Sequence, residues 1–171
     1  NYDSPAADLI AAILARATQR DLQSFAIEHL FGPLGITDFT WETDSAGFYR
    51  GSAGLVMRAR DIAKLGQLYL QQGRWQERQL IPPVWVEEST RVQVTLGDGA
   101  GYGFLWWVRD FEQLHHFSAV GFGGQLLLVV PAPQLVVVAQ HEWWQISAET
   151  AVSNVASFYN DIFMMLAKAS L

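Results

Sequence analysis

The spacing of the hydrophobic residues changes once along this chain, close to Gly101. Before that residue, apolar side chains recur every three or four positions, which is typical of amphipathic helices. After it, they alternate at a period of two over residues 102–108, and two further apolar stretches follow at 114–131 and 135–140. Helical spacing then returns at 148–167. Helices, then strands, then one closing helix predict an α+β fold in which helices pack on an antiparallel sheet.

The change in spacing also predicts two parts of the chain. Residues 1–100 are expected to form a helical, loop-rich part, and residues 101–171 to form three antiparallel strands and the closing helix. In the strand at 114–131, the glycines at 121, 123 and 124 either allow a bulge and bend or permit the close approach of a substrate.

Proline, glycine and capping residues predict where the helices of the first part begin and end. Ser4 followed by a proline predicts the start of the first helix, with Ser4 as its N-cap. A second helix is expected from residue 21 up to the stop at Gly32-Pro33-Leu34-Gly35, followed by an irregular surface loop at 37–53. Two further helices are expected at 59–72 and 83–90.

Composition excludes several classes of protein. Half of the 171 residues are hydrophobic and 16% are charged, a balance that excludes a disordered chain. The 11 basic residues are outnumbered by 17 acidic ones, so no basic surface is available for nucleic acid. No apolar run reaches the roughly 18 residues that a membrane helix needs, so no membrane span is predicted.

The motifs of several enzyme classes are absent from the sequence. There is no cysteine, and none of the four histidines belongs to a His-x-x-x-His pair, so neither a metal site nor a bound cofactor is predicted. The sequence contains no Gly-x-Ser-x-Gly, no phosphate-binding glycine loop and no Ser-x-x-Lys. The chain by itself therefore lacks a self-sufficient serine nucleophile.

A series of short segments, in their order and spacing, resembles the C-terminal half of the serine β-lactamase-related hydrolases. That superfamily includes class C β-lactamases, DD-peptidases, esterases and aminohexanoate-oligomer hydrolases, and the last group is the most similar in pattern. The segments are Tyr2-Asp3-Ser4, Leu30-Phe31-Gly32-Pro33-Leu34-Gly35-Ile36, Gly51-Ser52-Ala53-Gly54-Leu55, Ala59-Arg60-Asp61-Ile62-Ala63-Lys64-Leu65-Gly66, Tyr102-Gly103-Phe104-Leu105-Trp106-Trp107 and Ala119-Val120-Gly121-Phe122-Gly123-Gly124-Gln125.

The resemblance implies catalytic roles for two residues at the start of the chain. In that superfamily a Ser-x-x-Lys helix supplies the nucleophile and precedes a Tyr-x-Asn/Ser motif, which corresponds here to Tyr2 and Ser4. Tyr2 would be the general base or proton relay, and Ser4 the second polar residue. A free phenol titrates near ~10, so a neighbouring lysine and the positive end of a helix would be needed to favour its phenolate. The alternative is that Tyr2 is a surface tyrosine and Ser4 only a cap.

The third motif of the superfamily, Lys-Thr-Gly, falls on His116-Phe117-Ser118 when the alignment is counted back from Pro131. All three positions differ, which argues against recognition of a β-lactam carboxylate. His116, Ser118, Ala119 and Gly121 are the expected substrate- or oxyanion-binding residues, because a backbone N–H near Ala119 can act without a particular side chain. The alternative for His115-His116 is a pair split between the two strand faces, one packed and one in water.

The function implied by the resemblance is serine hydrolysis of a small ester or a linear amide through an acyl-serine intermediate. The expected partners are a small-molecule substrate and an N-terminal half that carries Ser-x-x-Lys. The alternatives are a β-lactamase or DD-peptidase, and a non-catalytic binding relative. The compartment, bacterial cytoplasm or periplasm, is left open.

Overall fold

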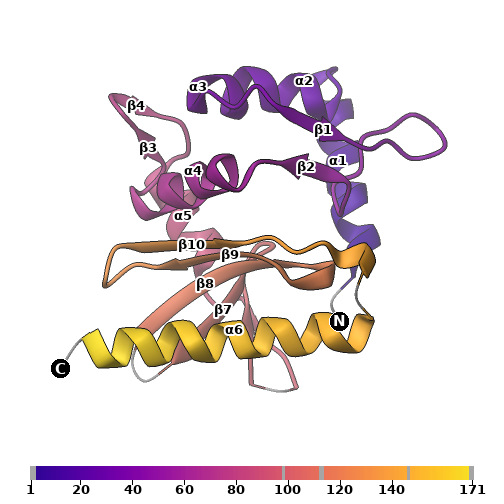
Figure 1. Cartoon of the computed structure of the whole chain (residues 1–171). Helices are drawn as coiled ribbons and strands as arrows, with labels where there is room; N and C mark the ends of the chain where they lie inside the picture. The colour runs from indigo at the N-terminus through magenta and orange to yellow at the C-terminus, as the bar shows by residue number, and fades with distance from the viewer. Residues whose placement is uncertain (1–2, 98, 112–113, 146, 170–171) are drawn as a thin grey trace. The chain divides into compact units, whose positions relative to one another are not determined.

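The structure is a computed structural model that describes residues 3–97, 99–111, 114–145 and 147–169 (Figure 1). The chain divides into two units, which are described separately. The first unit contains residues 1–61 and 74–80, and the second contains residues 62–73 and 81–171.

The first unit is mainly helical. Its elements are α1 (Ser4–Thr18), α2 (Leu22–Ala26), a π-helical turn (Ile27–Phe31), α3 (Gly32–Leu34), β1 (Phe39–Trp41), β2 (Leu55–Met57), β3 (Arg74–Trp75) and β4 (Arg78–Gln79). Asp21 caps α2, since its Oδ1 accepts the Ser24 backbone N–H at 2.8 Å. The helix ends within the predicted segment, Gly32-Pro33-Leu34-Gly35. Pro33 lies in the first turn of α3, where its missing N–H is not needed, and Gly35 with φ of +64° ends the helix.

The segment expected to be an irregular loop, 37–53, contains the strand β1, which forms a short antiparallel sheet with β2 just after the segment. β1 pairs with β2, with Thr40 opposite Val56, and an isolated bridge joins Thr43 to Tyr49. The indole of Trp41 donates to the Arg50 carbonyl at 2.8 Å. Sequence spacing missed these strands because each has only three residues and pairs across more than ten positions.

The second unit contains a six-stranded antiparallel sheet, so the expectation of three strands was too low. Its order is β10-β9-β8-β7-β6-β5. The strands are β5 (Val94–Thr95), β6 (Gly101–Tyr102), β7 (Trp107–Phe111), β8 (Leu114–Gly121), β9 (Gln125–Val130) and β10 (Leu135–Ala139), and the helices are α4 (Ala59–Leu70, from residue 62 on), α5 (Pro83–Thr90) and α6 (Ala148–Ala169).

Two predicted strands are each divided in the structure. The stretch 114–131 is a hairpin of β8 and β9, because Gly123 and Gly124 have φ of +80° and +87° and reverse the chain. Gly123 and Gly124 therefore form a turn and not a bulge, and Gly121 is the last residue of β8. The stretch 102–108 is interrupted where the Phe104 N–H donates to the Ser89 carbonyl at the end of α5.

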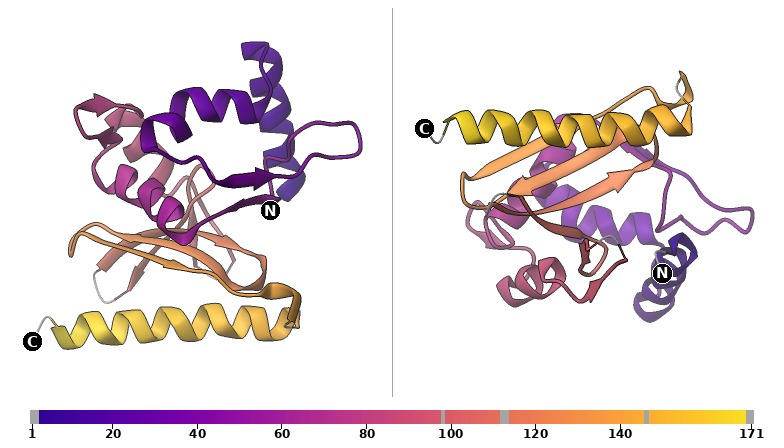
Figure 2. Two further views of the ribbon diagram at one scale, coloured as in Figure 1. Left: turned by 45° about the horizontal axis from the view of Figure 1, so that its top comes forward. Right: turned by 90° about the horizontal axis from the view of Figure 1, so that it is seen from below.

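Helices cover both faces of this sheet. α6 lies along one face, where Ile162 and Phe163 pack on Leu126, Leu128 and Val130 (Figures 1 and 2). On the other face, Ile62, Leu65 and Tyr69 of α4 pack on a cluster that contains Trp106, Val108, Phe117, Leu127 and Val129. Ser147 caps α6 as predicted, because its Oγ accepts the Thr150 N–H at 3.1 Å.

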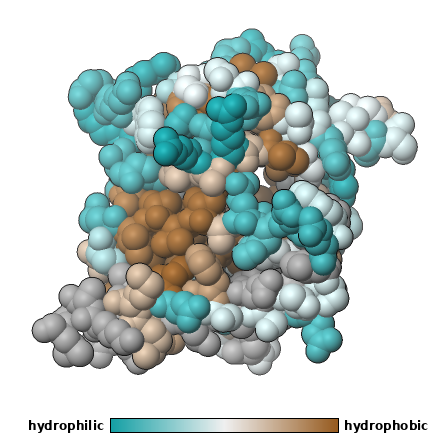
Figure 3. Space-filling view, viewed as in Figure 1, coloured by the Kyte–Doolittle hydropathy of each residue, from teal (hydrophilic) through white to brown (hydrophobic). Residues whose placement is uncertain are grey.

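The outermost strand of the sheet, β10, is entirely apolar. Its five residues, Leu135–Ala139, are all half-buried, and among the described strands β10 pairs with β9 only. Figure 3 shows apolar side chains gathered on the face of the molecule over this strand. Within the described part of the chain, no helix is long and apolar enough to cross a membrane.

Candidate functional site

The two residues expected to act in catalysis lie at the start of the chain. Tyr2 lies outside the described residues. Ser4 is exposed and is the first residue of α1. The N-cap is Asp3, so the predicted cap at Ser4 is wrong by one position, and Ser4 instead presents its hydroxyl from the first helical turn. Its catalytic role stays a prediction.

The backbone edge of β8 is open over its last three residues. β8 pairs with β7 up to Ser118, which lies opposite Trp107, whereas its pairing with β9 continues to Gly121. Ala119 and Gly121 are both exposed. Among the described strands, residues 119–121 of β8 therefore have a ladder partner on one side only. Such an edge offers backbone N–H groups in a fixed direction, which is what oxyanion stabilisation requires.

The side chains of His116 and Ser118 lie on the face of the sheet that α6 covers. Both are buried, with 2% and 1% of their surface exposed. Ser118 Oγ accepts a hydrogen bond from the Tyr159 hydroxyl at 2.6 Å, and the His116 ring lies 4.7 Å from that of Phe163. These two side chains thus form part of the packing between β8 and α6, and their expected contact with substrate stays a prediction.

The two adjacent histidines have opposite environments. His115 is exposed, and its Nδ1 lies 2.9 Å from Asp110 Oδ1. His116 Nδ1 lies 3.3 Å from the Leu114 carbonyl, and its buried Nε2 has no hydrogen-bond partner among the described residues. Burial lowers the pKa of His116 below its ordinary value, and the charges of His115 and Arg109 act in the same direction. The split pair, one packed and one in water, is the alternative stated from the sequence.

The turn between β8 and β9 contains an arrangement that sequence reasoning missed. The side-chain amide of Gln125 donates to the His141 carbonyl at 2.8 Å, and the ring of His141 lies against Gly124. Gln125 lies within a segment that carries the family resemblance, whereas His141 lies outside all of these segments. Nothing in the local sequence indicates that residues 16 positions apart meet at this turn.

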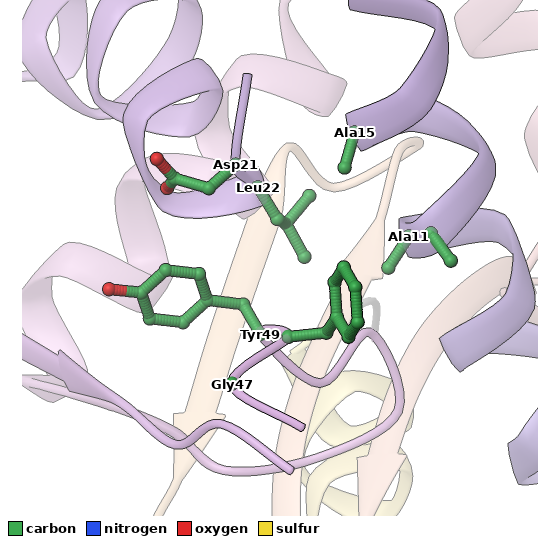
Figure 4. A pocket seen from close by; sticks show the side chains of 8 residues that line it. Ala11, Ala15, Asp21, Leu22, Gly47 and Tyr49 are labelled. Carbon is green, nitrogen blue, oxygen red and sulfur yellow. The ribbon is translucent and has the colours of Figure 1, made fainter. Parts of the chain in front are cut away.

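Other features of the described residues do not add to this site. Nowhere in that part of the chain do three or more histidine, aspartate or glutamate side chains gather closely enough to hold a metal ion. A pocket in the first unit is lined mainly by alanines of α1 and by Leu22, Phe48 and Tyr49 (Figure 4). Its carboxylate, Asp21, is already engaged by Ser24, so the pocket contains no free acid for catalysis.

An antiparallel sheet between two helical layers, with an open strand edge, is consistent with the serine β-lactamase-related class. The family model described as Beta-lactamase matches residues 1–146, and this chain belongs to that family.

Within this family, the chain is similar to two proteins named as 6-aminohexanoate-dimer hydrolases. The 6-aminohexanoate-dimer hydrolase of Paenarthrobacter ureafaciens is 27% identical, over 83% of this chain and 39% of the relative. A solved protein of Bacillus anthracis with a provisional 6-aminohexanoate-dimer hydrolase name is also 27% identical, with a TM-score of 0.78 over 98% of this chain and 44% of that one. The octameric penicillin-binding protein homologue of Pyrococcus abyssi shares the fold, with a TM-score of 0.64 at 14% identity over 76% of this chain and 35% of that chain. The chain spans less than half the length of these relatives.

Proposed function

We propose that this chain is the C-terminal part of a serine hydrolase that cleaves a linear amide or small ester through an acyl-serine intermediate. The nucleophile would come from a Ser-x-x-Lys segment upstream of Asn1. The chain together with that segment is called the complete protein below. The observation that carries the proposal is the similarity to 6-aminohexanoate-dimer hydrolases over nearly the whole chain.

The proposed chemistry assigns separate tasks to the upstream serine, to Tyr2 and to the backbone near Ala119. The upstream serine Oγ attacks the substrate carbonyl, and Tyr2 accepts the serine proton and passes it to the leaving amine or alcohol. Water then attacks the acyl-serine carbonyl and releases the acid, which restores the serine. A backbone N–H near Ala119, on the open edge of β8, would supply half of the oxyanion hole in both steps.

Two apolar surfaces support the presence of an upstream partner segment. In α1, three large side chains are exposed, namely Leu9, Ile10 and Ile13, each by more than half of its surface. In the sheet, β10 is an edge strand of five half-buried apolar residues. Soluble proteins rarely leave a long apolar edge strand or an apolar helix face in water, because both promote association. Additional chain that covers them would remove this cost.

The test compares residues 1–171 with the complete protein. Both are assayed for cleavage of a nitrophenyl ester and a 6-aminohexanoate dimer, and both are sedimented. We expect hydrolysis by the complete protein only, and association or poor solubility of the isolated chain. A matched control replaces the upstream nucleophilic serine by alanine and should abolish activity without changing sedimentation.

Three outcomes would contradict the proposal. A soluble, monomeric 171-residue chain with full activity would remove the need for an upstream nucleophile. Inactivity of the complete protein on both substrates would favour the non-catalytic relative. Cleavage of a chromogenic cephalosporin alone would favour the β-lactamase alternative.

A further inference from the structure

Gln125 holds the backbone of His141 through both of its polar groups. The Gln125 Nε2 donates to the His141 carbonyl at 2.8 Å, and the His141 N–H donates to Gln125 Oε1 at 3.4 Å. A primary amide that pairs with both backbone groups of one residue acts like a neighbouring strand. The chain after β10 is thereby fixed against the first residue of β9, where the two-stranded ladder has ended at Ala139 and Leu126.

Gly124 leaves room for the imidazole ring of His141. A Cβ at position 124 would lie 2.9 Å from Cδ2 and 3.5 Å from Nε2 of that ring. The φ of Gly124 is +87°, which also disfavours any residue with a side chain. The ring therefore lies against the turn, and His141 as a whole remains exposed. The fixed backbone and the contact of the ring with Gly124 limit the conformational freedom that His141 loses when it binds a ligand.

The imidazole of His141 lies against the turn that directly follows the open edge of β8. The turn is closed by the pair Gly121 and Gln125, so His141 contacts the same turn in which the open edge ends. Residues 119–125 contain no charged or titratable side chain. Of the two histidines on β8, His116 is buried under α6 and His115 pairs with Asp110. His141 thus brings a hydrogen-bonding ring to a turn that has none of its own.

We propose that His141 is a substrate-binding residue that recognises the carboxylate end of a linear amide substrate. This inference rests on the proposed function and names the substrate feature that the site reads. An imidazole N–H donates to a carboxylate oxygen, and the hydrogen bond is strengthened by the negative charge of its acceptor. A carboxylate is the anionic group at one end of an aminohexanoate oligomer, and it accepts a hydrogen bond from whichever ring nitrogen carries the proton.

The test uses ligand binding, so that it does not depend on turnover. The complete protein is titrated with 6-aminohexanoate and, separately, with the neutral carboxyl-end analogue 6-aminohexanamide, while the His141 ring proton resonances are followed by NMR. We expect 6-aminohexanoate to shift these resonances and to bind at least about tenfold more tightly than the amide, which is the scale of one charge-assisted hydrogen bond. His141→Phe should remove this preference, and His141→Gln should restore part of it.

The matched control is His115→Phe. His115 is an exposed residue near the start of β8, and its imidazole pairs with Asp110 of β7. This variant should leave the preference for 6-aminohexanoate unchanged. Equal binding of the two ligands by the wild-type protein, or an unchanged preference in His141→Phe, would overturn the inference even if the protein is an active hydrolase. Carboxylate-selective binding through His141 without any hydrolysis would leave the inference standing and refute the proposed function.

Discussion

The Tyr159 hydroxyl of α6 donates to Ser118 Oγ of β8 at 2.6 Å. This hydrogen bond connects the closing helix to the residue at which β8 leaves its pairing with β7. Ser118 is 1% exposed, and burial raises the pKa of Tyr159 above its ordinary value, with the Ser118 hydrogen bond acting in the opposite direction. The open edge of β8 therefore begins directly after Ser118, whose side chain is hydrogen-bonded to α6 on one face of the sheet.

Removal of either hydroxyl should destabilise the complete protein. Tyr159→Phe leaves the Ser118 hydroxyl buried without this donor, which costs about 1–3 kcal/mol of unfolding free energy. Urea unfolding of Tyr159→Phe, Ser118→Ala and the double variant measures the coupling, which we expect to be about 1 kcal/mol. Additive effects of the two substitutions would show that the hydrogen bond contributes nothing to stability.

Stability should fall in mildly acidic solution because of His116. Its pKa is lowered in the folded protein, mainly by burial, so the unfolded chain binds a proton more readily. Its contribution is constant above pH about 6.5, the ordinary value, and declines as the pH falls below it, at no more than about 1.4 kcal/mol per pH unit. The described charged or titratable neighbours are His115, Arg109, Asp110 and, from α6, Tyr159.

Urea unfolding at pH 7.5, 6.5 and 5.5 provides the measurement for this prediction. His116→Gln should flatten the decline, and His115→Gln, at an exposed position on the same strand, should retain it. If the wild-type protein and His116→Gln have parallel pH profiles, the buried imidazole does not cause the loss.

Gly123→Val should lower the stability of the protein by about 1–3 kcal/mol. The φ of Gly123 is +80°, a conformation that a β-branched residue adopts only under strain. Thermal melting of the variant measures this cost. Gly97→Val is the control, since nothing lies within 4 Å of a Cβ built at Gly97. Equal melting temperatures for the two variants would mean that the β8–β9 turn tolerates a side chain.

Tyr2→Phe in the complete protein should lower turnover of a nitrophenyl ester by roughly 10²-fold, the usual scale for loss of a positioned acid–base group. The melting temperature should be unchanged, because only a hydroxyl is removed. Tyr49→Phe, at the pocket of the first unit, is the control and should turn over normally. Wild-type turnover by Tyr2→Phe would support the interpretation of Tyr2 as a surface residue.

Local sequence predicted those parts of the fold whose cause is local. The helical spacing of 59–72 and 148–167 corresponds to α4 and α6, and Ser147 caps α6 as expected. The family motifs also indicated the α+β class and the β-lactamase relationship. These predictions succeed because amphipathic spacing and capping depend on residues within one or two turns of each other.

Tertiary structure decided the features that depend on distant residues. The sequence shows the same glycines whether residues 114–131 form one bent strand or a hairpin, and only the pairing of β8 with β9 selects the hairpin. The side of the sheet to which His116 points, and the contact of His141 with Gly124, likewise follow from packing between segments far apart in the chain. Burial and hydrogen bonding between such segments are properties of the folded chain, so a one-dimensional pattern specifies the turn residues but not what they contact.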